Sequence, residues 1–189
     1  MHIKTVFKPI GFNKKMRRFL FSLALSLCLG VVFGISASAQ NLSFSDPNAE
    51  YTFDLPEATW KMVVKPTATS PNVEYVYIDR LDAHLEIRKL SSKSDELVSD
   101  VIARDQEQKL QFLPGYVAGK EENFAGNLRG KAFNYEYIKA GKNMSGRFYY
   151  LKDDDSTDVY VLRFTGSRDK LRTIRNQTDS IARTFKPKK

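Results

Sequence analysis

The sequence has 189 residues, of which 42% are hydrophobic, 12% aromatic and 28% charged, and its formal net charge is +8. This aromatic content argues against a disordered chain, and a single long apolar run excludes a membrane protein with several spans. One cysteine, Cys28, cannot form an internal disulfide, which excludes a fold held by disulfide bonds.

The positive charge is concentrated at the N-terminus. Residues 1–39 contain six of the 30 lysines and arginines and no acid, which leaves 24 basic and 22 acidic residues after them and a net charge of only +2. Nucleic-acid binding usually needs a strongly basic domain, so this distribution predicts no nucleic-acid partner.

Residues 1–39 have the layout of a secretory signal peptide. A basic stretch at 14–18 precedes an apolar stretch at 19–35, and residues 36–39 are small and end in an Ala-x-Ala pattern. We therefore predict a signal peptide at 1–39 that is cleaved after Ala39. The protein is then exported, to a periplasm or to the extracellular space.

Two alternatives to cleavage stay open. The apolar stretch of about 17 residues is just long enough to remain as a membrane anchor. Attachment of a lipid at Cys28 is less favoured, because Leu27 is bulky where lipoprotein signals have a small residue. Residues 16–39 form a compact signal by themselves, which makes Met16 an alternative start of the chain.

Residues 40–189 are predicted to form one domain. We expect its polar lead-in at 40–47 and its last residues, 186–189, to be loosely held. Alternating apolar and polar residues predict strands at 51–55, 60–64, 73–78, 83–90, 116–118, 133–137, 148–151 and 159–164. We expect strand 60–64 to pair with 51–55, and strand 83–90 with 73–78.

Two helices are predicted. The first is expected to be capped by Ser92 or Ser94, with Asp95 and Glu96 near its positive end, and to stop at the Pro-Gly pair 114–115. Its apolar face consists of Leu97, Val98, Val101, Ile102, Phe112 and Leu113. The second helix follows residues 166–167, and its apolar stripe consists of Leu171, Ile174, Thr178, Ile181, Ala182 and Phe185.

This order of elements predicts an α+β fold with two main helices packed against one sheet. The connections between strands are short, so the strands should pair mostly antiparallel. In strand 83–90 the pattern points Ala83, Leu85 and Ile87 to one face and His84, Glu86 and Arg88 to the other.

Few residues after position 39 suit catalysis. They include one histidine, His84, and no cysteine, and no Gly-x-Ser-x-Gly motif is present. A catalytic triad that uses His84 with Asp82 or Glu86 is an alternative, but we favour a histidine on the polar or helix-covered face of its strand. We assign no catalytic residue and predict that the protein is not an enzyme.

The sequence offers one weak candidate for a metal site. Asp153, Asp154, Asp155 and Asp158 lie close together, but they lack the alternating spacing and central glycine of an EF-hand loop. We expect a solvated hairpin tip, with a weak calcium site or a contact with a cationic partner as the alternatives. Neither Gly-x-Gly-x-x-Gly nor a Gly-Lys-Ser/Thr pattern occurs, so we predict no cofactor.

Basic residues gather near the last helix. They are Arg163, Arg168, Lys170, Arg172 and Arg175, interrupted by Asp169 and Asp179. We interpret them as a charged helix face, while contact with anionic lipid head groups or with an acidic protein partner stays open.

Both ends of the predicted domain resemble the PsbP-like family. The resemblance lies in Phe44-Ser45-Asp46-Pro47, in Phe53-Asp54-Leu55-Pro56 followed by Trp60, and in the helix ending Ile181-Ala182-Arg183-Thr184-Phe185, and it spans about residues 44–186. The family includes the extrinsic subunit of photosystem II, DcrB-like exported bacterial proteins and a nuclear-import factor that shares the fold. The resemblance implies an α/β/α sandwich on a central antiparallel sheet and a role in binding or assembly.

No functional residue carries over from this family, because the metal-linked histidines of its photosynthetic members have no counterpart beyond, at most, His84. We therefore expect a monomeric, exported, non-catalytic accessory or binding domain that acts at a membrane-associated complex or at the cell envelope. Its partner would be a protein or envelope component, with peripheral contact with a membrane left open. A carrier of a lipid or small apolar ligand and a hydrolase of unknown substrate are the alternatives.

Overall fold

A computed structural model describes residues 42–93, 95–153 and 156–188. These residues belong to one compact unit, Gln40–Lys189. The predicted signal peptide lies outside the described residues, so its cleavage stays a prediction. Within the described ranges, no helix is both long and apolar enough to cross a membrane.

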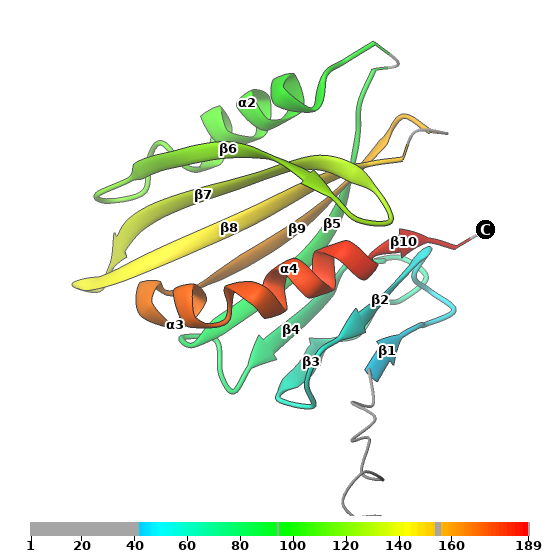
Figure 1. The fold of residues 1–189 in the computed structure, drawn as a ribbon, viewed down its shortest axis with the longest axis horizontal. Helices are drawn as coiled ribbons and strands as arrows, with labels where there is room; N and C mark the ends of the chain where they lie inside the picture. Colours follow the sequence, from blue (N-terminus) through cyan, green and yellow to red (C-terminus); the bar gives the residue numbers. More distant parts are fainter. Residues whose placement is uncertain (1–41, 94, 154–155, 189) are drawn as a thin grey trace, which may run out of the picture. The chain divides into compact units, whose positions relative to one another are not determined.

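The described residues form a main sheet of seven strands in the order β3-β4-β5-β9-β8-β7-β6 (Figure 1). Neighbouring strands are antiparallel throughout this sheet, as the short connections predict. The strands are β3 (Trp60–Val64), β4 (Val73–Tyr77), β5 (Ala83–Ser91), β6 (Val117–Ala125), β7 (Arg129–Lys139), β8 (Lys142–Lys152) and β9 (Asp158–Ser167).

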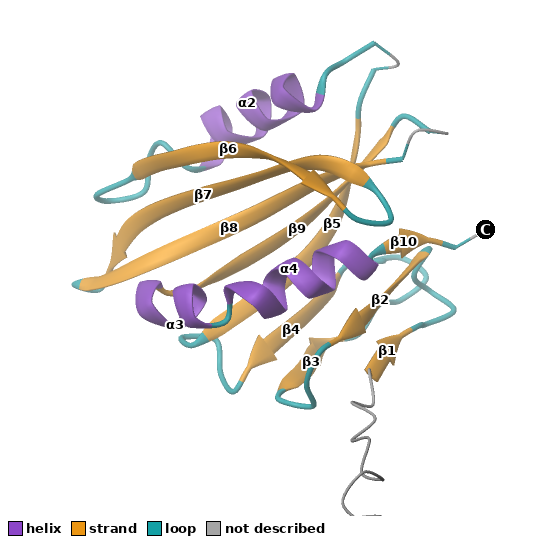
Figure 2. Ribbon diagram, in the orientation of Figure 1, coloured by secondary structure: helices purple, strands orange, loops and turns teal. Residues whose placement is uncertain are grey.

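Helices cover both faces of this sheet (Figure 2). The helix α2 (Val98–Lys109) packs on one face, and α3 (Arg168–Thr173) and α4 (Arg175–Thr184) pack on the other. A small sheet in the order β1-β2-β10 lies beside α4; its strands are β1 (Leu42–Phe44), β2 (Tyr51–Leu55) and β10 (Lys186–Pro187). The predicted α+β class is therefore confirmed, and the layers are those of an α/β/α sandwich.

Each face of the sheet has its own hydrophobic core. The core under α4 includes Phe53, Leu85, Ile181 and Phe185, and the core under α2 includes Val101, Phe133 and Val161. This separation follows from the alternation of side chains along each strand. Full burial of a side chain of this size contributes about 1.5–3 kcal/mol, so the two cores hold the three layers together.

The predicted pairing of strand 51–55 with strand 60–64 is wrong. β2 pairs with β1 and β10, whereas β3 pairs with β4. The inward side chains of β2 explain the difference, because Tyr51 and Phe53 lie over the main sheet, where Tyr51 contacts Tyr160 and Phe185. Burial of these rings places β2 in a second layer, so it cannot also lie beside β3.

The described parts of the lead-in (42–47) and of the tail (186–188) are held by other segments rather than loosely placed. Phe44 in β1 is buried and stacks on Phe53, with 4.8 Å between the ring centroids. At the other end, the Lys188 N–H donates to the Glu50 carbonyl at 2.8 Å. Both ends pair with β2, because an isolated strand leaves its backbone groups unpaired.

The first helix is shorter than predicted. α2 begins after Leu97, which has no side-chain cap, and Ser92 instead donates to the Thr157 carbonyl at 2.7 Å; Ser94 lies outside the described residues. The predicted apolar face fails at both ends, since Leu97 is 68% exposed and Phe112, beyond the end of the helix, is 77% exposed.

The last predicted helix consists of two helices. α3 and α4 meet at Ile174, whose backbone leaves helical geometry at φ −96° and ψ 16°. The described chain therefore has three helices, not two. The predicted stripe is nevertheless correct, because all six of its members are buried: Leu171, Ile174, Thr178, Ile181, Ala182 and Phe185.

Candidate binding groove

A groove of about 610 Å³ opens between β6–β8 and the helices α3 and α4. Small residues such as Gly119 and Ser145 line it on the sheet side. The full lining is Val117, Ala118, Gly119, Asn134, Tyr135, Glu136, Ser145, Arg147, Arg168, Leu171, Arg172, Arg175 and Thr178. Among these residues are four arginines and one acid, so the lining carries an excess of positive charge.

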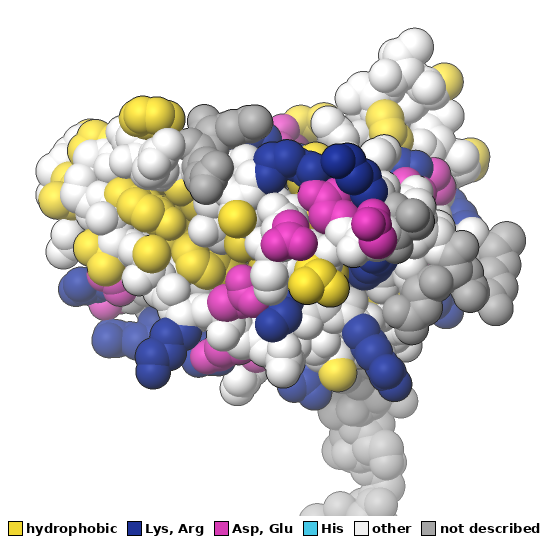
Figure 3. Space-filling model, turned by 90° about the horizontal axis from the view of Figure 1, so that it is seen from above, with side chains coloured by type: hydrophobic (Ala, Val, Ile, Leu, Met, Phe, Trp, Pro, Cys, Tyr) yellow, Lys and Arg dark blue, Asp and Glu magenta, His cyan; other side chains and the backbone are white. Residues whose placement is uncertain are grey.

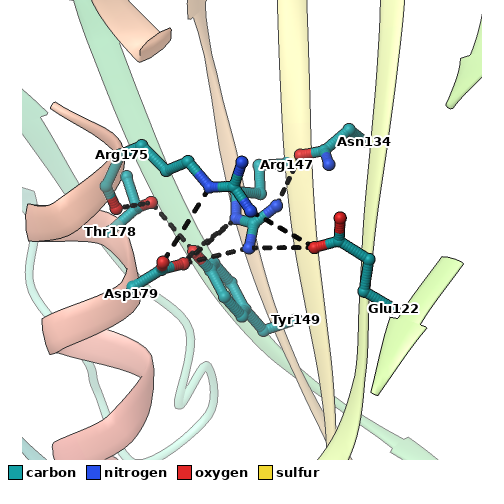
Figure 4. A network of polar contacts seen from close by, with 7 residues as sticks. All are labelled: Glu122, Asn134, Arg147, Tyr149, Arg175, Thr178 and Asp179. Atoms are coloured by element: carbon teal, nitrogen blue, oxygen red, sulfur yellow. Dashed lines mark hydrogen bonds and ion pairs between the residues drawn. The ribbon is translucent and has the colours of Figure 1, made fainter. Parts of the chain in front are cut away.

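Arg147 lies at the inner end of this groove, as the most buried of its four arginines, and Figure 4 shows its polar contacts. It is only 7% exposed, because β8 carries it under α4. Its Nη2 donates to Asp179 Oδ1 at 3.0 Å, its Nε to the Tyr149 hydroxyl at 2.6 Å and its Nη1 to Asn134 Oδ1 at 2.8 Å. A buried guanidinium is tolerated when it is paired and hydrogen-bonded in this way.

The surroundings keep Arg147 charged and Tyr149 neutral. Burial opposes the charge on Arg147, but Tyr149 and Asp179 outweigh that effect and raise the pKa of the guanidinium. Burial also raises the pKa of Tyr149, whose hydroxyl donates to Asp179 and contacts Thr178 at 2.8 Å. The inner end of the groove is therefore a fixed positive charge whose position is set by α4.

Three further arginines lie along the outer part of the groove. Arg175 donates to Glu122 at 3.2 Å, and Arg168 lies 3.7 Å from Glu136. Arg172 donates to Asp169 at 3.2 Å, although both side chains are more than three-quarters exposed. Ion pairs this exposed contribute at most about 1 kcal/mol, so an external carboxylate can compete for these guanidinium groups.

The structure divides the basic cluster predicted from the sequence. Arg168, Arg172 and Arg175 line the groove. Lys170 lies over the Tyr77 ring at 5.6 Å, and Arg163 lies over the Phe148 ring at 5.6 Å, in the core under α2. Three of the five predicted residues therefore belong to one site.

Arg147 was missed by the sequence analysis. In a strand, a charged residue usually points to solvent, and nothing local indicates that a helix covers it. The available signal was its setting, a lone arginine in the otherwise uncharged stretch 143–151, directly before the predicted strand 148–151. Charged residues are seldom buried without a partner, so such a residue indicates an ion pair or a binding site.

His84 lies outside this groove. Its Nε2 lies 2.8 Å from Glu74 Oε2 on the neighbouring strand, and Arg80 also donates to Glu74, at 2.7 Å. Burial raises the pKa of Glu74, but the contacts with His84 and Arg80 together lower it by more than burial raises it. The pKa of Glu74 therefore lies below its usual value. The predicted neighbours Asp82 and Glu86 are not its hydrogen-bond partners in the described part of the chain.

The aspartates proposed as a weak metal site are only partly described, because Asp154 and Asp155 lie outside the described residues. Asp158 lies 3.4 Å from Lys89. Among the residues that the structure describes, no group of three or more histidine, cysteine, aspartate or glutamate side chains is arranged to hold a metal ion. The calcium hypothesis at 153–158 therefore stays untested.

No protein-family model and no curated protein sequence matches the chain. Solved structures do match it. Cyanobacterial PsbP (CyanoP) from Synechocystis sp. PCC 6803 is 16% identical, with a TM-score of 0.55 over 82% of this chain and 96% of that one. The Ran-binding protein Mog1p of Saccharomyces cerevisiae is 9% identical, with a TM-score of 0.57 over 79% and 96%.

A protein of unknown function from Pseudomonas aeruginosa also matches, with 14% identity and a TM-score of 0.50 over 79% of this chain and 98% of that one. At such low identity, these likenesses establish the fold alone. The chain therefore has the α+β fold that PsbP and Mog1p share.

Proposed function

We propose that the protein is an exported, non-catalytic binding domain whose groove holds an acidic segment of a protein partner. The observation that carries the proposal is the lining of the groove, which contains four arginines and one acid, while Asp179, Asp169 and Glu122 pair with three of these arginines from outside the lining. Guanidinium groups bind carboxylates through paired hydrogen bonds, so this lining favours aspartate and glutamate side chains.

The geometry favours an extended segment. β6 is an edge strand of the main sheet, and its residues Val117, Ala118 and Gly119 form one wall of the groove. An edge strand offers free backbone groups for pairing with another chain. The arginines of α3 and α4 on the opposite wall would then contact the acidic side chains of that segment.

The fold likeness supports a binding role by analogy only. Mog1p, which shares this fold, is a Ran-binding protein. Membership of the PsbP-like family is part of the same proposal, and it rests on the motifs at 44–60 and 174–185 together with the fold. The alternatives receive less support, because the charged lining suits an apolar ligand poorly and His84, the residue considered for a hydrolase, lies outside the groove.

Titration calorimetry with a hexaglutamate peptide tests the groove. We expect binding that weakens as salt rises, and no binding of hexaglutamine. Joint substitution of Arg168→Ala and Arg172→Ala should weaken hexaglutamate binding about tenfold. The control removes the same charge elsewhere, through Arg129→Ala with Arg183→Ala, neither of which lines the groove. Equal binding by the two double variants would overturn the proposal.

The export part of the proposal rests on residues 1–39. N-terminal sequencing of the protein recovered outside the cytoplasm should give a chain that begins at Gln40. A recovered chain that begins at Met1 or Met16 would contradict cleavage and favour the anchor. Capture of partners from envelope extracts can then be compared between the two double variants.

A further inference from the structure

Three large hydrophobic side chains are exposed on the loop after α2, at the start of β6 and near the end of β7. Phe112 is 77% exposed, Val117 is 61% exposed and Ile138 is 44% exposed; we call these three residues the apolar tip. Figure 3 shows hydrophobic side chains gathered at this end of the described unit, on the left of the view. Soluble proteins rarely expose neighbouring hydrophobic side chains without a partner.

The loop that carries Phe112 is fixed against β7. The Ile138 N–H donates to the Pro114 carbonyl at 2.7 Å. Gly115 has φ +63°, and a Cβ added to it would lie 2.9 Å from Ile138 Cδ1, so the position requires glycine. The loop after α2 and the end of β7 therefore fix each other's position near Ile138.

Positive charges predominate along these two segments, although Glu136, just before the second one, lies opposite Val117 in the β6–β7 pair. Residues 109–120 contain Lys109 and Lys120 and no acid, and residues 137–147 contain Lys139, Lys142 and one arginine and no acid. Lys109 pairs with Asp105 at 3.1 Å. Lys139 and Lys142 flank the exposed β7–β8 turn and have no ion-pair partner among the described residues.

A hollow of about 390 Å³ lies beside Ile138. Its lining is mostly apolar, with two cations among Leu113, Pro114, Tyr137, Ile138, Lys139, Ala140 and Arg163. Apolar walls beside Lys139, unpaired within the described ranges, match the junction of a phospholipid, where a phosphate meets acyl chains, whereas Arg163 lies over Phe148 and 3.6 Å from Glu86. The hollow and the tip thus both combine exposed apolar side chains with nearby positive charge.

We propose that the apolar tip docks on an anionic phospholipid surface, with Phe112, Val117 and Ile138 inserted between the head groups and the lysines on the phosphates. Large apolar side chains insert into the interface, while lysines gain from the negative surface potential. Within the described part of the chain, Lys139 and Lys142 have no ion-pair partner and are available to lipid phosphates, whereas Glu136, opposite Val117, lies 3.7 Å from Arg168. The proposal does not depend on the groove, because the residues of the two sites differ except for Val117.

Depth-sensitive fluorescence tests the insertion on the exported protein. The variant Phe112→Trp is mixed with vesicles of phosphatidylcholine and phosphatidylglycerol in equal parts, in which the phosphatidylcholine is brominated. We expect a blue shift and quenching that exceed those of the wild-type protein, whose one tryptophan, Trp60, is buried. The matched control is Leu97→Trp, since Leu97 is 68% exposed and precedes α2, and it should not be quenched.

Co-sedimentation with the same vesicles tests both kinds of contact. Joint substitution of Phe112→Ser and Ile138→Ser should lower the partition coefficient about tenfold or more. Joint substitution of Lys139→Gln and Lys142→Gln should lower it about fivefold per lysine, and raised salt should mimic that loss. Equal binding to pure phosphatidylcholine, or quenching of the Leu97→Trp variant to the same extent as the Phe112→Trp variant, would overturn the proposal.

Discussion

The two faces of the main sheet hold their helices through matching polar groups. Tyr149 and Tyr150 are neighbours in β8, so they point to opposite faces, and both are fully buried. The hydroxyl of Tyr149 donates to Asp179 on α4, and the hydroxyl of Tyr150 donates to Asp105 on α2 at 2.9 Å. One aspartate therefore ties each helix to the middle of the sheet.

The arginine partners make the two faces different. On the α2 face, Arg88 of β5 pairs with Asp105, and both side chains are at least 85% buried. On the α4 face, Arg147 pairs with Asp179 but also approaches Glu122 to 3.9 Å, and it lines the groove. The same combination of tyrosine, aspartate and arginine is thus enclosed under α2 on one face and lines the groove on the other.

The largest expected effect on stability comes from the loss of Asp105, the buried aspartate that ties α2 to the sheet. Asp105→Ala would leave the Arg88 guanidinium buried beside Tyr150 without its carboxylate. Breaking a buried pair in this way costs about 3–5 kcal/mol, and urea denaturation measures the loss. The control is Asp100→Ala on the exposed side of α2, where only a favourable helix-dipole contact worth up to about 1 kcal/mol is lost.

The same substitution on the other face should cost less. After Asp179→Ala, Arg147 keeps its hydrogen bonds to Asn134 and Tyr149, and Glu122 lies close enough to approach. The Asp179 side chain is 22% exposed against 7% for Asp105, so water can reach the vacated position. We expect a loss of about 1–3 kcal/mol by urea denaturation. If Asp179→Ala lowers the free energy of unfolding as much as Asp105→Ala does, then the two aspartates contribute equally to stability and the two faces do not differ.

Sequence patterns predicted the strands well because burial of one face imposes a period of two residues. In β5, Ala83, Leu85 and Ile87 are fully buried, as the alternation indicates. The same pattern could not show that α2 covers the other face, where Arg88 is paired and largely buried. Alternation tells which residues share a face, but it does not tell whether that face meets water or a helix.

Pairing between distant segments was also beyond local patterns. The position of β2 depends on Tyr51 and Phe53 packing over the main sheet, and its partners β1 and β10 come from opposite ends of the described chain. The groove depends on such contacts as well, since β6–β8 supply one wall and α3 and α4 supply the other. The sequence near the last helix therefore showed that arginines gather there, but it could not show that β6–β8 complete a groove with them.

The smallest expected effect is the acid sensitivity that Asp105 confers. Burial raises the pKa of Asp105, but Arg88, Tyr150 and Lys109 lower it more, so the net pKa lies below its usual value of 3.8. The folded protein therefore keeps the carboxylate ionised at pH values where the unfolded chain already binds protons. The resulting stabilisation is complete above the unfolded pKa and is lost as the pH falls through the folded pKa.

Urea denaturation of the wild-type protein and of Asp105→Asn, from about pH 7 to about pH 3, measures this contribution. The difference in unfolding free energy between the two should be constant near neutrality and should shrink below about pH 4. This pH-dependent part of the stability is modest, because burial raises the pKa of Asp105 and so offsets part of the lowering by its ion pairs. A difference that persists unchanged to about pH 3 would mean that hydrogen-bond geometry, rather than the charge on Asp105, holds α2 to the sheet.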